Sequence, residues 1–168
     1  MIGVTAGGVT VGLALLATYL IKWWPGIKSL QASFITHLGR LLPFISGAAY
    51  GALGALSVMG LIGWFFDTVI FVSNWLGDVA LLLGVGAKAG MSAQGSYLPL
   101  TQQGSYMVAL LTAVVLAVIR WRACGPEVKR GAVCGALLGT SAGVAGLVAV
   151  PLAQAANWAG AALYGAIA

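Results

Sequence analysis

The feature that most constrains this chain is a series of long apolar runs that hold almost no charge. They cover 2–21, 41–66, 106–121 and 131–151, and Arg120 is the only charged residue within them. About 20 apolar residues in an α-helix cross the ~30 Å hydrocarbon core of a bilayer. Charged residues make up 7% of the chain, against about 25% in soluble domains. We therefore predict an all-α integral membrane protein with four transmembrane helices in a single membrane domain, residues 1–168.

Basic residues predict how these helices are oriented. Seven of the eight lysines and arginines fall in two loops, 22–40 and 120–130. They are Lys22, Lys28, Arg40, Arg120, Arg122, Lys129 and Arg130. Basic loops beside membrane spans stay in the cytoplasm and contact anionic lipid head groups. We expect a multi-pass protein of the bacterial inner membrane with both termini outside, and no nucleic-acid partner.

The residues from 67 to 88 are apolar but contain Asp67, Asn74 and Asp78, which share one face of a helix. If this segment spanned the bilayer, the second basic loop would lie outside, against the positive-inside pattern. We therefore predict a re-entrant or interfacial helix within an outer loop, 67–105. An apolar helical extension, 152–168, completes the fold. In a ring of copies, the three polar residues would form a pore mouth that favours cations.

Glycine spacing predicts how the helices associate. Gly131, Gly135, Gly139 and Gly143 are four residues apart, and Gly47 and Gly51 repeat the step. Such a stripe lets two helix backbones approach closely, which matters in lipid because apolar burial gives little driving force there. We predict helix-packing faces at these glycines. The sequence leaves open whether the partner helix belongs to the same chain or to another copy.

The sequence contains no motif of a hydrolase, nucleotide-binding loop or zinc site. Cys124 and Cys134 lack the paired spacing of metal ligands, and we expect both to be reduced. His37 is the single histidine, which is either a pH sensor or a solvated surface residue. We expect no cofactor, no metal and no enzymatic activity.

Three functions agree with these features. The first is a pore- or channel-forming subunit of a homo-oligomer that closes through small-residue faces. The second is a non-conducting scaffold subunit of a bacterial secretion, conjugation or filament machine, with other membrane subunits as partners. In its Gly/Ala-rich character the chain is similar to small conjugation and holin-type membrane proteins. The third is a small transporter, for which the 67–88 segment would be a broken helix.

Overall fold

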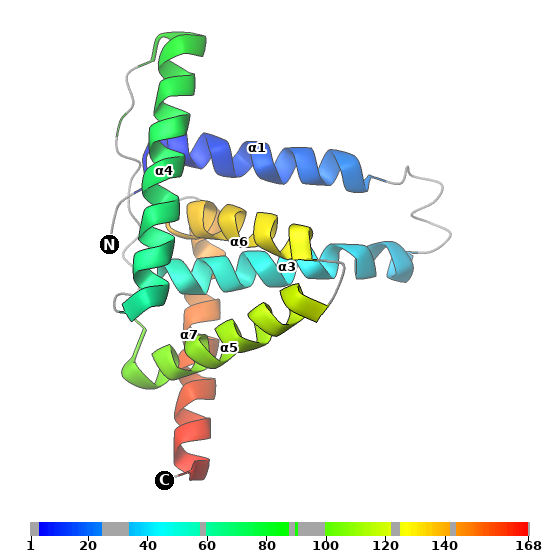
Figure 1. Ribbon diagram of the computed structural model, residues 1–168, viewed down its shortest axis with the longest axis vertical. Helices are drawn as coiled ribbons and strands as arrows, with labels where there is room; N and C mark the ends of the chain where they lie inside the picture. The colour runs from blue at the N-terminus through cyan, green and yellow to red at the C-terminus, as the bar shows by residue number, and fades with distance from the viewer. Residues whose placement is uncertain are drawn as a thin grey trace.

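The computed structural model describes residues 4–24, 34–57, 60–87, 90, 100–121, 125–141 and 144–167, and these residues are almost entirely helical (Figure 1). The helices described are α1 (Ala6–Trp23), α3 (Phe34–Ala55), α4 (Gly60–Val85), α5 (Gln102–Trp121), α6 (Gly125–Gly139) and α7 (Val144–Ile167). The predicted all-α class is therefore confirmed for the described part of the chain.

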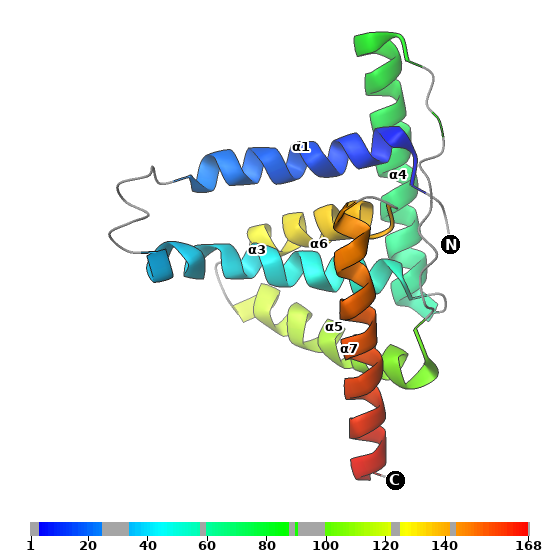
Figure 2. The same ribbon diagram turned by 180° about the vertical axis from the view of Figure 1, so that it is seen from behind.

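The helices run in two main directions. In Figures 1 and 2, α1, α3, α5 and α6 run broadly along one direction, with α3 parallel to α6 and α1 opposed to both. The long helices α4 and α7 lie crosswise to these four at one end, and they point in opposite directions. The last turns of α1 and α5, together with the first turns of α3 and α6, are at the other end.

Three described helices are long and apolar enough to cross a membrane, namely α1, α4 and α5. This finding supports the prediction of a membrane protein. The structure does not reproduce the predicted set of four spans as continuous helices. Helix α6 has 15 residues and reaches only about 22 Å at 1.5 Å per residue.

The chain is built from two similar halves, α1–α3–α4 and α5–α6–α7. The pattern Gly-Ala-x-x-Gly-Ala-Leu occurs on α3 at 47–53 and on α6 at 131–137. Asn-Trp-x-Gly occurs on α4 at 74–77 and on α7 at 157–160. Thr-x-x-Gly stands at the start of α1 and of α5, at 5–8 and 101–104. Equivalent helices carry equivalent motifs, so the fold has approximate internal two-fold symmetry.

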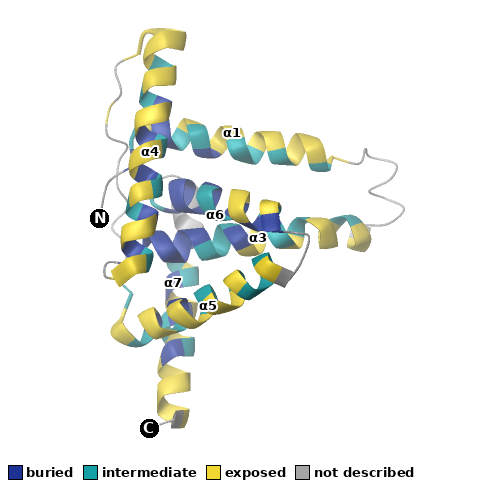
Figure 3. Ribbon diagram, viewed as in Figure 1, coloured by how far each residue is buried: buried dark blue, intermediate teal, exposed yellow. Residues whose placement is uncertain are grey.

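The core lies where the two halves meet. Among the described helices, α3 and α6 form the most extensive pair, and Figure 3 shows buried residues concentrated on them. Phe66 and Ile70 of α4 pack with Leu137 of α6 in the largest cluster, and the ring of Tyr50 meets that of Phe66 edge-on at 5.6 Å. Ala149 and Ala153 of α7 pack on the other side of α3.

Two predicted helix boundaries are wrong. The run 41–66 is not one helix, because α3 ends at Ala55 and α4 begins at Gly60. Residues 67–85 of the predicted segment 67–88 are thus the continuation of α4 rather than a separate element. Gly60 has φ of +89°, a left-handed conformation that glycine adopts without steric cost and that allows the chain to turn sharply.

The run 131–151 is also divided. Helix α6 ends at Gly139, and the Thr140 hydroxyl donates to the Ala136 carbonyl at 2.9 Å. The Ser141 hydroxyl donates to the Leu138 carbonyl at 2.8 Å, so carbonyls left open at the end of the helix gain partners. Pro151, the last residue of the predicted span 131–151, lies inside α7. A proline can be accommodated within a helix at the cost of one backbone hydrogen bond.

Candidate functional site

The polar residues of α4 meet the start of α1. The Thr5 hydroxyl donates to Oδ1 of Asp78 at 2.7 Å, and the Thr5 backbone N–H donates to Oδ1 of Asn74 at 3.1 Å. The Thr5 oxygen in turn accepts the N–H of Gly8 at 3.2 Å. Thr5 is therefore the N-cap of α1, and two α4 side chains complete the cap. This network satisfies backbone donors that a helix start would leave open.

A similar arrangement, with one accepting side chain in place of two, occurs at the start of α5. Oδ1 of Asn157 on α7 accepts the Thr101 backbone N–H and the Thr101 hydroxyl, each at 3.0 Å. The Thr101 oxygen accepts the N–H of Gly104 at 3.1 Å. Thr5 and Thr101 thus cap equivalent helices, and Asn74 and Asn157 hold equivalent positions on the crosswise helices. We call these two networks the threonine caps.

Glycines bring each crosswise helix against the helix that it caps. A Cβ added at Gly77 of α4 would overlap the backbone of Gly7, and one added at Gly160 of α7 would overlap the Gln103 carbonyl. Thr5, Thr101 and Asn157 were not predicted as polar contacts between helices. The repeated Thr-x-x-Gly and Asn-Trp-x-Gly patterns were the signal that could have found them.

The predicted pore-mouth residues all lie on α4. Asn74 is buried, and Asp67 and Asp78 are half-buried. Asn74 and Asp78 come together at the first threonine cap, where their oxygens accept hydrogen bonds from Thr5. Asp67 stands two helical turns before Asn74, on the same side of the helix. The function of these three residues as a pore mouth stays a prediction.

The predicted ladder glycines of α6 face α3 of the same chain. A Cβ at Gly131 would overlap the Phe44 carbonyl, one at Gly135 would overlap the Ala48 carbonyl, and one at Gly139 would meet the Ala52 Cβ at 2.7 Å. Side chains at these positions would force the two backbones apart. Gly143 lies outside the described residues.

The glycines of α3 face α6 in return. A Cβ at Gly47 would overlap the Val128 carbonyl, and one at Gly51 would overlap the Ala132 carbonyl. Each helix therefore places its glycines against the carbonyls of the other. We call this contact the glycine seam. It lies between the two halves of one chain.

Basic residues gather at the end of the molecule away from α4 and α7. Lys22, Arg40 and Arg130 line one pocket of about 340 Å³ together with Tyr19, Trp23, Pro43 and Glu127. We call it the basic pocket. Arg120 and Lys129 are exposed near the same end, at the end of α5 and the start of α6. Lys28 and Arg122 lie outside the described residues.

Aromatic side chains hold the walls of the basic pocket. The Tyr19 hydroxyl donates to the Arg40 carbonyl at 3.2 Å, and the Trp23 indole N–H donates to the His37 carbonyl at 2.9 Å. The Tyr19 ring stacks on the Phe44 ring with centroids 4.0 Å apart. These contacts tie the last turns of α1 to the first turns of α3.

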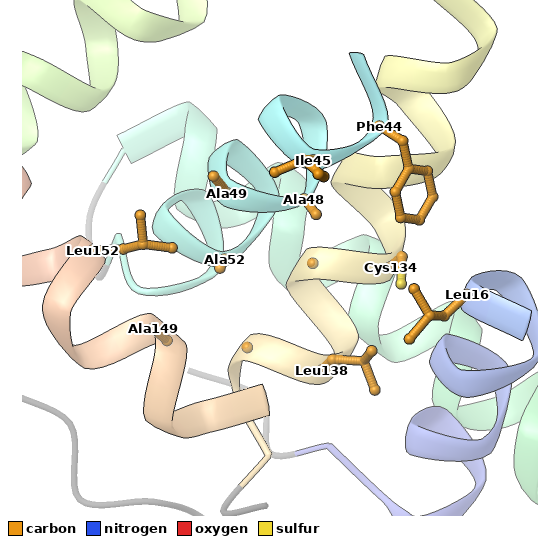
Figure 4. Close-up of a pocket in the computed structure, with 12 residues that line it drawn as sticks. Leu16, Phe44, Ile45, Ala48, Ala49, Ala52, Cys134, Leu138, Ala149 and Leu152 are labelled. Atoms are coloured by element: carbon orange, nitrogen blue, oxygen red, sulfur yellow. The ribbon is translucent and has the colours of Figure 1, made fainter. Parts of the chain in front are cut away.

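Two apolar crevices flank the glycine seam. The first, about 310 Å³, is shown in Figure 4, where Leu16, Phe44, Cys134 and Leu138 surround one side of it. The second, about 380 Å³, lies on the opposite flank of α3 and α6. By their places in the repeat, Tyr50, Ala132 and Phe66 of the second correspond to Cys134, Ala48 and Ala149 of the first. The crevices are thus another feature that the two halves share.

The described residues contain no group of three or more histidine, cysteine or acidic side chains that could hold a metal ion. Cys134 is buried, and its thiol donates to the Gly12 carbonyl at 3.4 Å. Comparison of the chain with protein-family models, with curated proteins and with solved structures finds no match.

Proposed function

We propose that the chain is a membrane-embedded scaffold subunit that does not conduct through its own helices. It crosses the bilayer with α1, α3, α5 and α6 and lays α4 and α7 along the outer surface. One observation carries this proposal: the glycines of the seam and the polar side chains of the threonine caps contact other helices of the same chain. The surface that remains for contact with lipid or a neighbouring subunit is largely apolar.

The crosswise arrangement supports this placement. If α1 and α5 lie along the bilayer normal, α4 cannot also do so, because it crosses them (Figures 1 and 2). Helix α4 then lies in the plane of the membrane, which agrees with the interfacial position expected for 67–88. Its exposed Trp64, Phe71 and Trp75 are of the residue types that favour the head-group region.

The charges support the orientation. Lys22, Arg40 and Arg120 are at the end opposite α4 and α7, and the positive-inside rule assigns such an end to the cytoplasm. Helices α4 and α7 would then face the outside of a bacterial inner membrane. Helix α6 and the turn that follows it reach α7 at that outer side, so a short α6 is compatible with a four-span arrangement.

The lining of the interior supports a scaffold more than a pore. The two described crevices beside the glycine seam are lined almost entirely by apolar side chains, which do not hold a file of water. The polar side chains Asn74, Asp78 and Asn157 are engaged in the threonine caps. A conducting path would therefore have to form between copies of the chain.

A homo-oligomeric pore is the second candidate, and the position of Asp67 favours it. Asp67 and Asp78 are half-buried on the side of α4 that carries the buried Asn74, beside a flank that is widely exposed. If copies met along that flank, the two carboxylates would border an axis and attract cations.

Size and ion flux, measured on one preparation, separate the two functions. We expect purified protein in nanodiscs to have a defined mass, and liposomes containing it to pass K⁺ no faster than protein-free liposomes. Asp67→Asn and Asp78→Asn each remove one negative charge, and in Asp78→Asn the asparagine keeps the Oδ1 acceptor used in the cap. A K⁺ flux in the parent protein that both variants reduce would replace the scaffold proposal with the pore.

A further inference from the structure

The basic pocket brings together basic side chains from different parts of the sequence. Three of its lining side chains are basic and one, Glu127, is acidic, so its formal charge is 3 − 1 = +2. The basic groups come from three different helices, α1, α3 and α6. A pocket of this kind suits a phosphate group, which accepts hydrogen bonds from several directions.

The walls of the basic pocket are fixed before any ligand enters. The Tyr19 and Trp23 side chains are each bonded to a backbone carbonyl of α3, and Tyr19 is also stacked on Phe44. A ligand would therefore not have to order the aromatic wall on binding, which lowers the entropy lost. Tryptophan and tyrosine in such a place are typical of the head-group level of a bilayer.

An apolar crevice continues along the same helices. Leu16 of the first crevice is one turn from Tyr19 on α1, and Phe44 follows Pro43 on α3. Figure 4 shows the Phe44, Leu16 and Leu138 side chains gathered beside the crevice. The basic pocket and the first crevice are thus neighbours along α1 and α3. Together they make a groove whose two parts have the polarity sequence of an anionic phospholipid.

We infer that this groove binds one anionic phospholipid, with its phosphate held by Lys22, Arg40 and Arg130 and an acyl chain in the first crevice. The inference rests on the proposed placement of the basic end at the cytoplasmic leaflet. The second half of the chain does not repeat the site. The positions equivalent to Lys22 and Arg130 carry Val118 and Ser46, so one lipid per chain is expected.

Native mass spectrometry of the purified full-length protein tests the site. The protein is titrated in detergent with phosphatidylglycerol and, separately, with phosphatidylcholine of the same acyl chains. We expect one phosphatidylglycerol to bind in preference to phosphatidylcholine. Arg40→Gln with Arg130→Gln should weaken it about 25-fold, since each basic residue near a membrane surface contributes roughly fivefold.

Three variants serve as controls. Arg40→Lys with Arg130→Lys keeps the charge and should retain most of the binding. Arg120→Gln with Lys129→Gln removes the same net charge outside the pocket and should leave the single bound lipid in place. Glu127→Gln removes the acidic group and should strengthen binding about fivefold.

Four results would overturn the inference: no preference for phosphatidylglycerol in the parent protein, equal weakening by both glutamine pairs, weaker binding in Glu127→Gln, or full displacement of the lipid by millimolar inorganic phosphate. Full displacement by inorganic phosphate would mean that the pocket binds a phosphate group without the acyl chain. Circular dichroism on each variant shows that it is folded. Failure of the proposed membrane placement would be seen differently, as a basic end that lies on the outer side of the membrane. Lipid binding in detergent does not depend on that orientation.

Discussion

At the scale of single residues, two threonines determine where helices begin in the two halves of the molecule. Thr5 and Thr101 each accept the N–H three residues ahead and donate to a side chain of the crosswise helix. Each cap therefore stabilises a helix end and a contact between helices at the same time. The two caps differ in one partner, because the Thr5 hydroxyl donates to the Asp78 carboxylate and the Thr101 hydroxyl to the Asn157 amide oxygen.

The first prediction concerns these caps. Thr5→Ala and Thr101→Ala should each lower the free energy of unfolding by about 1 kcal/mol, because an N-cap hydroxyl is removed. Thr5→Ser and Thr101→Ser keep the hydroxyl and should cost much less. Reversible unfolding in mixed detergent micelles, followed by circular dichroism, measures the difference. Equal losses for alanine and serine would show that the hydroxyl bonds add nothing.

The second prediction concerns the glycine seam. Gly135→Ala should destabilise the fold by about 1–3 kcal/mol, because the new Cβ overlaps the Ala48 carbonyl and the backbones must separate. Gly39→Ala is the control on α3, where an added Cβ meets nothing within 4 Å. That change should be neutral or stabilising by about 0.5–1 kcal/mol. Identical unfolding curves for the two variants would contradict close backbone contact at the seam.

Sequence predicted the residue types at these contacts better than their partners. Gly131, Gly135 and Gly139 stand out by their spacing, but spacing cannot tell an intrachain contact from one between copies. Asn74 and Asp78 stand out as polar residues in an apolar run, and their place on one face follows from helical geometry. That they reach Thr5 depends on α4 crossing α1, which no local pattern encodes.

At the scale of helices, the breaks between them decide the architecture. The break between Ala55 and Gly60 divides the apolar residues from 41 to 85 into two helices, α3 and α4. Because of this break, α4 runs crosswise to α3 (Figure 1). Apolar residues continue through this break and through the one after α6, so hydropathy alone places the helix ends too late, as it did for 41–66 and 131–151.

The third prediction concerns the start of α4. Gly60→Ala should lower the free energy of unfolding by about 1–2 kcal/mol, since φ of +89° at Gly60 is unfavourable for residues with a Cβ. Gly84→Ala, on the same helix, should instead stabilise by about 0.4–1 kcal/mol. A Cβ would meet nothing within 4 Å at either position, so backbone conformation is what differs. Detergent unfolding of both variants makes the comparison, and a stabilising Gly60→Ala would contradict the left-handed conformation.

At the scale of the whole molecule, the two ends differ in chemistry. One end carries the basic pocket and the exposed Arg120, and the other carries the threonine caps and the crosswise helices. The sequence indicated this polarity through its basic loops. It did not indicate that the two basic loops follow equivalent helices of a repeat. The repeated motifs are short, lie far apart within each half, and consist largely of common small residues.

The fourth prediction concerns this polarity. In a background with Cys124→Ser and Cys134→Ala, cysteines at Gly39 and Arg120 should react with an impermeant maleimide from the cytoplasmic side. A cysteine at the exposed Gln102, at the start of α5, should react from the other side. Labelling of intact cells and of inverted vesicles distinguishes the two. Reaction of Gly39→Cys and Arg120→Cys from opposite sides would exclude the four-span arrangement.

The internal two-fold arrangement lets the two sides of the molecule differ from each other. If two identical protomers met at the glycine seam, the residues on its two flanks would have to be the same. Here the two halves belong to one polypeptide, so a substitution can change one flank without changing the other. Ile45 stands beside one crevice and Lys129 beside the other, and Ala149 stands where its counterpart is Phe66. A chain with two repeated halves can therefore keep a symmetric backbone while the two flanks of its seam bind different molecules.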